Sequence, residues 1–201
     1  EPALLERLWQ AAPQIRRRDM PVCLPLLRRS AEFHLRHITR GGDPFEMLEA
    51  RPLDLGHWSA HKLEAMSNFS LRHGEAVAIG LAIDAVYSSL ALGLPPGEAA
   101  RVLVCLDRLG FRLDHPQLAD TDQLLDGLEE FRQHLGGQLT LTLLKEIGRP
   151  VDVCQVDRKL LRRAVVQVRE LAGSSEKAME RSFRREQDPR GVTRPRRTRG
   201  S

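Results

Sequence analysis

Aromatic side chains are scarce in this sequence of 201 residues: they make up 4% of it, although 41% of the residues are hydrophobic. A core with so few aromatics must consist mainly of leucine, valine, isoleucine and alanine. Such a composition favours packed helices over a β-sandwich, which draws on aromatic and β-branched residues. The length suits one domain. We therefore predict a single, mainly α-helical domain and exclude an all-β fold.

Cysteine is also rare. Cys23, Cys105 and Cys154 are an odd number, lie far apart and form no Cys-x-x-Cys pair. This excludes a disulfide framework and a thiolate metal site, and it indicates reduced thiols in the cytoplasm. No signal peptide is visible. The longest apolar run, Ala76 to Leu94, is interrupted by Asp84 and two serines, so we expect a buried core helix and no membrane span.

The positive charge is concentrated at one end. The formal net charge is +4, yet residues 181–201 carry eight arginines against Glu186 and Asp188. We predict a helical domain over residues 1–175 and a disordered, arginine-rich tail over 176–201. Arginines without interleaved aromatics offer no base stacking, so nucleic acid is not an expected partner. The chain has no initiator methionine, and we expect it to begin inside a larger protein.

Apolar spacing of three and four residues predicts helices almost throughout. Glycine and proline pairs mark where they stop, at Gly41–Gly42, Pro95–Pro96 and Gly136–Gly137. Alternation of leucine with threonine and of valine with polar residues predicts one small hairpin, joined across residues 148–150. The expected helices cover residues 2–17, 21–38, 57–66, about 75–93, 98–109, 121–131 and 158–171, and the expected strands cover 139–144 and 151–156.

Three histidines carry the chemistry. His57 and His61 are four residues apart, so on a helix they share one face, and Gly56 permits a turn just before them. His73 follows 16 residues after His57, before a long apolar helix. A helix N-terminus disfavours a protonated imidazole, which suits a neutral metal ligand. The two imidazoles at 57 and 61 can share one cation, or one can bind it while the other serves a substrate.

The segment RPLDLGHWSAHKLE, residues 51–64, and the segment HGEAVAIG, residues 73–80, resemble the 3-dehydroquinate synthase family. The family pattern is roughly Leu-Asn-x-Gly-His-x-x-x-His-x-x-Glu, followed by His-Gly-Glu-Ala-Val-x-x-Gly. The late Gly136–Gly137 and the strand after it also resemble the family. The resemblance implies the family's helical C-terminal domain, with at most a small β-hairpin.

The resemblance also implies an activity. Sugar phosphate cyclases of this family are lyases that use a divalent metal, zinc or cobalt, and NAD; they oxidise a heptulose 7-phosphate transiently, eliminate phosphate, reduce the ketone and close the ring by an aldol step. His57 and His73 match the metal ligands, and His61 matches the catalytic histidine. The family's third ligand, a glutamate, and its NAD-binding domain are expected upstream of this chain. The fragment alone is therefore expected to be inactive, and the full-length protein is expected to be a homodimer acting on a phosphorylated sugar.

The substrate-binding positions depart from the family pattern. Asp54 stands where the family has asparagine, and a family lysine is replaced by His34 or Arg36, depending on the alignment. These changes indicate a divergent branch, similar to homologues in ebo-type gene clusters or to cyclases of sedoheptulose 7-phosphate. The residues expected to bind substrate are Arg51, Asp54, Arg132, His34 and Arg36, with Arg132 for the phosphate.

Two glutamates are expected to support the site. Glu64 could orient an imidazole from behind, or lie on solvated helix surface; Glu75 could do likewise, or stabilise a helix start. Two other functions stay open at this point: an iron-type alcohol dehydrogenase relative, which also has a His-x-x-x-His pair, and a helical binding module without chemistry.

Overall fold

The computed structural model describes residues 1–40, 52–172 and 174. Over these residues the fold is helical, with one two-stranded antiparallel sheet. The α helices are α1 (Pro2–Arg16), α2 (Met20–Arg40), α3 (His57–Met66), α4 (His73–Leu92), α5 (Pro96–Leu109), α6 (Thr121–His134) and α7 (Arg158–Leu171). The 3₁₀ turns are η1 (Pro52–Asp54) and η2 (Pro116–Ala119), and the strands are β1 (Leu141–Glu146) and β2 (Arg149–Val153).

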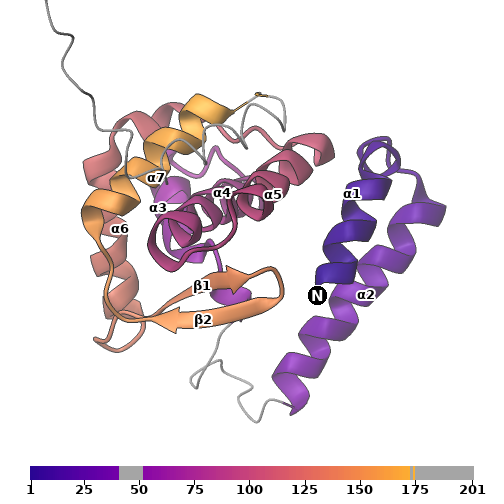
Figure 1. The fold of residues 1–201 in the computed structure, drawn as a ribbon, viewed down its shortest axis with the longest axis horizontal. Coiled ribbons are helices and arrows are strands. Elements are labelled where there is room, and N and C mark those ends of the chain that lie inside the picture. The colour runs from indigo at the N-terminus through magenta and orange to yellow at the C-terminus, as the bar shows by residue number, and fades with distance from the viewer. Residues whose placement is uncertain (41–51, 173, 175–201) are drawn as a thin grey trace, which may run out of the picture.

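Helix α4 is the centre of the domain. It packs against α3, α5, α7 and β1, which surround it in Figure 1. Its residues are apolar on nearly all sides, as a helix enclosed by others requires. By length and composition it could cross a membrane, but 67% of its most apolar window is buried inside the domain. The predicted buried core helix is confirmed.

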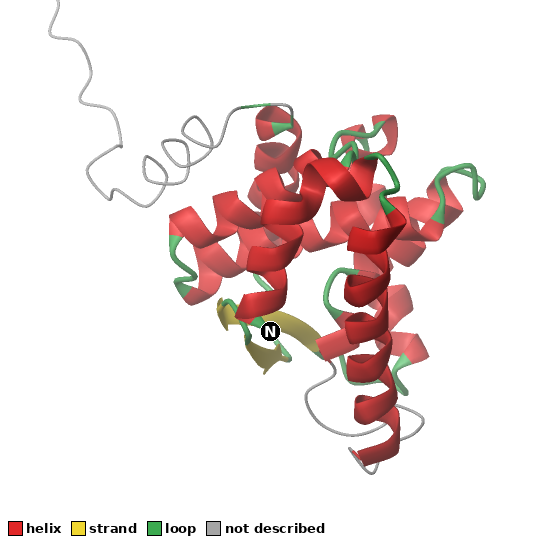
Figure 2. Ribbon diagram, turned by 90° about the vertical axis from the view of Figure 1, so that its right-hand side faces the viewer, coloured by secondary structure: helices red, strands yellow, loops and turns green. Residues whose placement is uncertain are grey.

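The hairpin closes one edge of the domain (Figure 2). Leu141 pairs with Val153 and Leu143 with Val151, and the side chains of Leu141 and Leu143 are buried. The backbone N–H of Leu144 donates to the hydroxyl of Ser88, 3.0 Å away, which ties β1 to α4.

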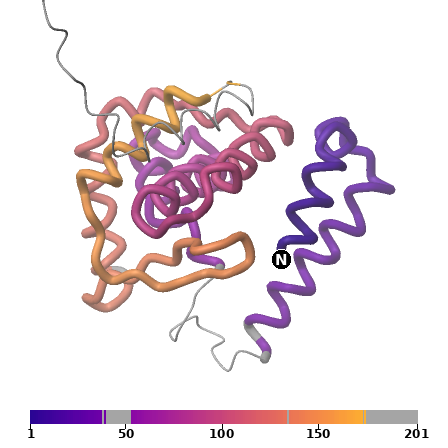
Figure 3. The backbone as a smooth tube through the Cα atoms, viewed as in Figure 1, coloured from indigo at the N-terminus to yellow at the C-terminus, as the bar shows by residue number. Residues whose placement is uncertain are grey.

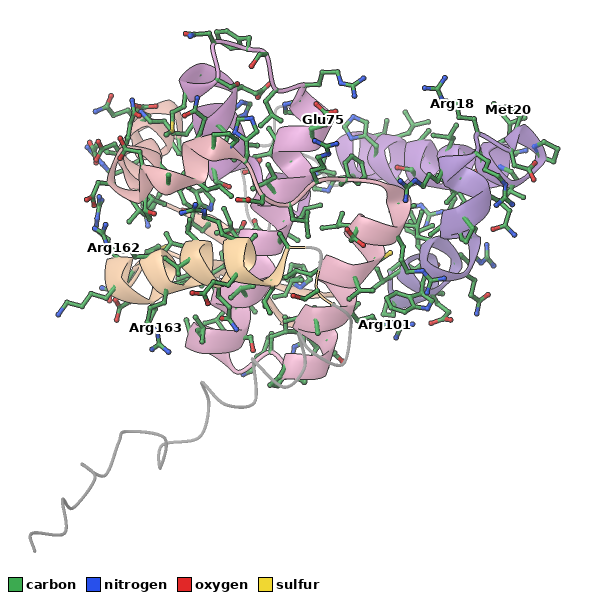
Figure 4. All side chains as sticks on the ribbon, turned by 90° about the horizontal axis from the view of Figure 1, so that it is seen from above. Arg18, Met20, Glu75, Arg101, Arg162 and Arg163 are labelled. Atoms are coloured by element: carbon green, nitrogen blue, oxygen red, sulfur yellow. The ribbon has the colours of Figure 1, made fainter. Side chains whose placement is uncertain are left out.

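Helices α1 and α2 form an antiparallel pair at the side of the domain (Figure 3). α1 packs on α5, where Glu6 is ion-paired with Arg101, and α2 packs mainly on α1. Figure 4 shows Arg18 and Met20 at the outer end of this pair, away from the rest of the domain. At the other end, Pro2 lies against Gly148 of the hairpin turn.

The predicted elements are confirmed with small shifts at their ends. α3 has the bounds expected from sequence, and the Asp157 carboxylate caps α7 by accepting from the N–H of Leu160 at 3.1 Å. The hairpin differs, because Arg149 and Pro150 belong to β2 and the turn is confined to residues 147–148. The predicted tail, 176–201, and the Gly41–Gly42 break lie outside the described residues.

Candidate metal centre

The start of α3 positions the first two histidines. Gly56 caps the helix with φ of +82°, a left-handed conformation that favours glycine. Trp58, Ser59, Ala60 and Leu63 are buried. His57 and His61 lie one helical turn apart, and the side chain of His61 is 59% exposed.

The first residue of α4 brings in the third histidine. His73 begins the helix, and its side chain is 53% exposed. α3 and α4 pack closely, since the Cβ of any other residue at Gly80 would overlap the carbonyl oxygen of Gly56. After the turn at residues 67–72, α4 therefore runs back along α3, and Gly80 of α4 touches Gly56 at the beginning of α3.

The three imidazoles form an almost equilateral triangle. Their ring centres are 5.5 Å apart for His57 and His73, and 5.8 Å apart for the other two pairs. Two imidazoles bound to one tetrahedral ion at roughly 2.0–2.1 Å have their ring centres roughly 5 Å apart. These distances between ring centres are compatible with histidines that share a divalent cation. The roles of His57 and His73 as ligands and of His61 as the catalytic histidine stay predictions.

The Nδ1 atoms of His57 and His73 each face a hydrogen-bond acceptor. Nδ1 of His57 lies 3.4 Å from the carbonyl oxygen of Leu55, and Nδ1 of His73 lies 3.0 Å from Oε2 of Glu64. When Nδ1–H donates to such an acceptor, Nε2 keeps its lone pair, which is the usual state of a metal-bound histidine.

Glu64 lies between two histidines. The same Oε2 that contacts His73 is 3.5 Å from Nδ1 of His61, and the carboxylate is only 16% exposed. The potential ligand atoms of His61, Glu64 and His73 all lie within 4.8 Å of one another. Glu64 can therefore orient His73 from behind or, with a rearrangement of the rings, ligate a cation itself.

A hollow of about 310 Å³ opens beside His61. Trp58 and Lys62 line it from α3, and α6 contributes the opposite wall. Lys62 is ion-paired with Glu130 of α6 and packs over Gly127, where a Cβ would lie 2.8 Å from that of Lys62. Trp58 and Lys62 were not among the predicted site residues, although positions 58, 61 and 62 share one helix face.

Glu75 lies in the first turn of α4, two residues after His73. Glu75 accepts from the backbone N–H of Arg72 at 3.1 Å and pairs with its guanidinium, which lowers the pKa of this carboxyl. It thus stabilises the start of α4, the alternative stated above, and Figure 4 shows it at that end of the helix.

Arg132 is held at the end of α6. Its guanidinium bonds both oxygens of Glu129, at 2.6 and 2.8 Å, and the carbonyl oxygen of Gly137 at 2.5 Å. The guanidinium lowers the pKa of Glu129 to about 2. Its role as a phosphate contact stays a prediction, and Lys62 is the cation that lines the hollow beside His61.

The remaining predicted residues lie on α2 and in the segment that precedes α3. His34 and Arg36 lie on this helix, and Arg36 lines a different, largely apolar hollow together with Leu53 and Leu55. Asp54 ends η1, three residues before His57. Arg51 lies outside the described residues. Their predicted roles in substrate binding stay predictions.

Comparison with known proteins decides the family. Residues 1–132 match the family model described as the 3-dehydroquinate synthase C-terminal domain. The chain belongs to the 3-dehydroquinate synthase family. It is 44% identical over 110 residues to a 3-dehydroquinate synthase of Aeropyrum pernix, covering 54% of this chain and 30% of that protein. It is 35% identical over 134 residues to a 2-epi-valiolone synthase of Actinosynnema mirum, covering 64% and 35%.

The fold agrees with this family. A 2-epi-5-epi-valiolone synthase from Streptomyces hygroscopicus, solved with NAD⁺ and Zn²⁺ bound, superposes with a TM-score of 0.76 at 25% identity. The match covers 84% of this chain and 46% of that one. The chain thus spans less than half of the length of these relatives, and the predicted helical C-terminal domain of the family is confirmed.

Proposed function

We propose that this chain is the metal- and substrate-binding part of a sugar phosphate cyclase, a lyase that eliminates phosphate from a heptulose 7-phosphate and closes the ring by an aldol step. The observation that carries the proposal is the convergence of His57, His61 and His73 beside the carboxylate of Glu64. The relative solved with NAD⁺ and Zn²⁺ supports the choice of these two cofactors.

His57 and His73 would hold the metal, zinc or cobalt, through Nε2, because their Nδ1 atoms face Leu55 and Glu64. A divalent metal bound there would polarise a substrate oxygen as a Lewis acid. Glu64 keeps the ring of His73 oriented and raises its basicity as a ligand. The family's third ligand would come from a part of the protein upstream of residue 1.

His61 would face the substrate. It lines the hollow beside the cluster, where its ring can hold or move a proton. Lys62 lines the same hollow and is ion-paired there with Glu130, so its ammonium would have to exchange this carboxylate for the phosphate of a sugar substrate. Trp58 limits the hollow on the side of the domain core.

NAD does not fit the described residues alone. Their only sheet is an antiparallel pair, and no parallel βαβ unit with a glycine-rich turn occurs among them. We therefore assign no step through NAD to this part of the protein and place its binding in a preceding domain. A longer protein that includes this domain, acting as a homodimer, would be the active form.

The test measures metal content and turnover together in that longer protein. His57→Ala and His73→Ala should each remove the metal and the activity. His61→Ala should keep the metal and slow turnover by roughly 10²- to 10⁴-fold, as expected for loss of a general acid or base. His115→Ala is the control, because His115 caps η2 instead of joining the cluster. Loss of metal in the His61 variant would overturn its assignment as catalytic, and unchanged metal in the His57 variant would overturn the ligand assignment.

A further inference from the structure

A buried carboxylate in α4 binds the start of α3 on both sides of His57. Asp84 is 1% exposed. Its Oδ2 accepts the backbone N–H of Gly56 at 2.7 Å, and its Oδ1 accepts the indole N–H of Trp58 at 2.8 Å. The two donors belong to the residues immediately before and after His57.

The backbone contact between the two helices brings this carboxylate within reach. A Cβ at Gly56 would lie 2.7 Å from the backbone nitrogen of Leu81, and Gly80 leaves equally little space. Asp84 is one helical turn beyond Gly80 on α4, so it lies over the same crossing. Both carboxylate oxygens are then used by donors of α3 and its cap.

We propose that Asp84 is a positioning residue: by binding the Gly56 N–H and the Trp58 indole, it fixes the peptide that carries His57 and the ring that forms the wall of the hollow beside His61. The inference rests on the proposed function of the histidine cluster. His57 has one neighbour on each side tied to Asp84, so the direction of its imidazole is set from α4, the same helix that carries His73. Helix α4 thus carries one expected metal ligand, His73, and fixes the position of the other, His57.

An aspartate meets the geometry better than an asparagine. Both groups that face it are N–H donors, and a carboxylate offers two acceptors, whereas a carboxamide offers one acceptor and an NH₂ group. In Asp84→Asn the carboxamide NH₂ must therefore face either the Gly56 N–H or the Trp58 indole N–H, although the side chain keeps its shape. The expected result is a shifted helix start in a folded protein.

The experiment uses this 201-residue chain and Co²⁺ as the probe, at about pH 8, where Asp84 is ionised and both of its oxygens accept. Asp84→Asn should weaken Co²⁺ binding about tenfold, the usual lower effect of losing a group that orients a metal ligand. Ser88→Ala is the matched control: Ser88 is a buried polar residue on the same helix whose hydroxyl accepts from Leu144, away from the cluster. It should lower stability and leave the dissociation constant for Co²⁺ unchanged.

A second variant tests the donor clash directly. Trp58→Phe removes the indole N–H, so in the double variant with Asp84→Asn the carboxamide nitrogen no longer faces a donor. The effect of Asp84→Asn on Co²⁺ binding should therefore be smaller in the Trp58→Phe background. The proposal would be overturned if Asp84→Asn weakened Co²⁺ binding equally with Trp58 and with Phe at position 58. It would also be overturned if wild type and Asp84→Asn bound Co²⁺ with equal affinity while both are folded.

A readout without metal separates this proposal from the proposed function. Ring-nitrogen NMR of the histidines should show a larger shift for His57 than for His115 when Asp84 becomes asparagine. If wild type binds no Co²⁺ while this shift occurs, the metal assignment fails and the positioning role stands. If Co²⁺ binds and the His57 resonance does not move in Asp84→Asn, the positioning role fails alone.

Discussion

The crossing of α3 and α4 and the α1–α2 pair are built on opposite principles. At the crossing, backbone touches backbone through Gly56 and Gly80, and a buried carboxylate is satisfied by two donors. In α2, by contrast, the structure shows no buried residue among those whose side chains it describes. The close backbone contact between α3 and α4 therefore lies next to His57, the first residue of the histidine cluster.

The surface of α2 has its own pattern. Four large apolar side chains on it are about half exposed: Met20 at 49%, Leu24 at 55%, Leu27 at 59% and Leu35 at 58%. Its ion pairs, Arg28 with Glu32 and Arg29 with Glu1, lie at the surface, where such pairs contribute little. Pro25 interrupts its hydrogen bonding. Local unfolding should therefore begin in this pair of helices and not at the site.

The first and largest prediction concerns Gly80. Gly80→Ala should lower the free energy of unfolding by about 3 kcal/mol, the upper end of the usual cost of overpacking, since its Cβ would overlap the carbonyl oxygen of Gly56 and the helices would have to separate. Gly74→Ala is the control on the same helix. Nothing lies within 4 Å of a Cβ there, so it should stabilise by up to about 1 kcal/mol. Urea unfolding checks both, and similar stabilities for the two variants would show that the crossing is not tight.

The sequence could predict the elements and the convergence, but not the contacts that fix them. Helical periodicity and glycine or proline stops determine the helix ends, and the spacing of His57 and His61 places both rings on one face. The partnership of Glu64 with His73 spans nine residues, and that of Asp84 with Gly56 spans 28. Such pairs depend on how two helices cross, which no local pattern specifies.

The contacts of the predicted substrate-binding residues could not be derived from the sequence for a related reason, and their roles in substrate binding stay predictions. Arg132 was predicted to contact the phosphate, and in the structure its guanidinium contacts Glu129 and the carbonyl oxygen of Gly137. Lys62 was not among the predicted site residues, and it lines the hollow beside His61. Long, flexible cations have many possible partners, so spacing alone does not determine which one they contact.

The second prediction uses the pH dependence of the crossing. Burial raises the pKa of Asp84 from 3.8 to about 7, although the N–H groups of Trp58 and Gly56 act in the opposite direction. Between these values the folded chain retains a proton that the unfolded chain has released. The free energy of unfolding should therefore fall as pH rises through this window, by at most about 1.4 kcal/mol per pH unit, and become level above it.

Asp84→Asn has no such proton, and the other ionisable groups are common to both proteins. The stability difference between wild type and Asp84→Asn, measured by urea unfolding at pH 5, 6, 7 and 8, should shift in favour of Asn as pH rises. A difference that is constant with pH would show that Asp84 keeps its ordinary pKa in the folded chain.

The smallest change in stability is expected for substitutions on α2. Leu24→Ser and Leu27→Ser on α2 should each change the free energy of unfolding by no more than about 0.5 kcal/mol, because their side chains already contact water over more than half of their surface. Leu63→Ala is the buried counterpart in α3 and should cost about 2–5 kcal/mol. A loss of more than 2 kcal/mol in Leu24→Ser would mean that another surface covers this face of α2. Dependence of that loss on protein concentration would identify a second copy of the chain as the cover, whereas a loss independent of concentration would place the cover within the same chain.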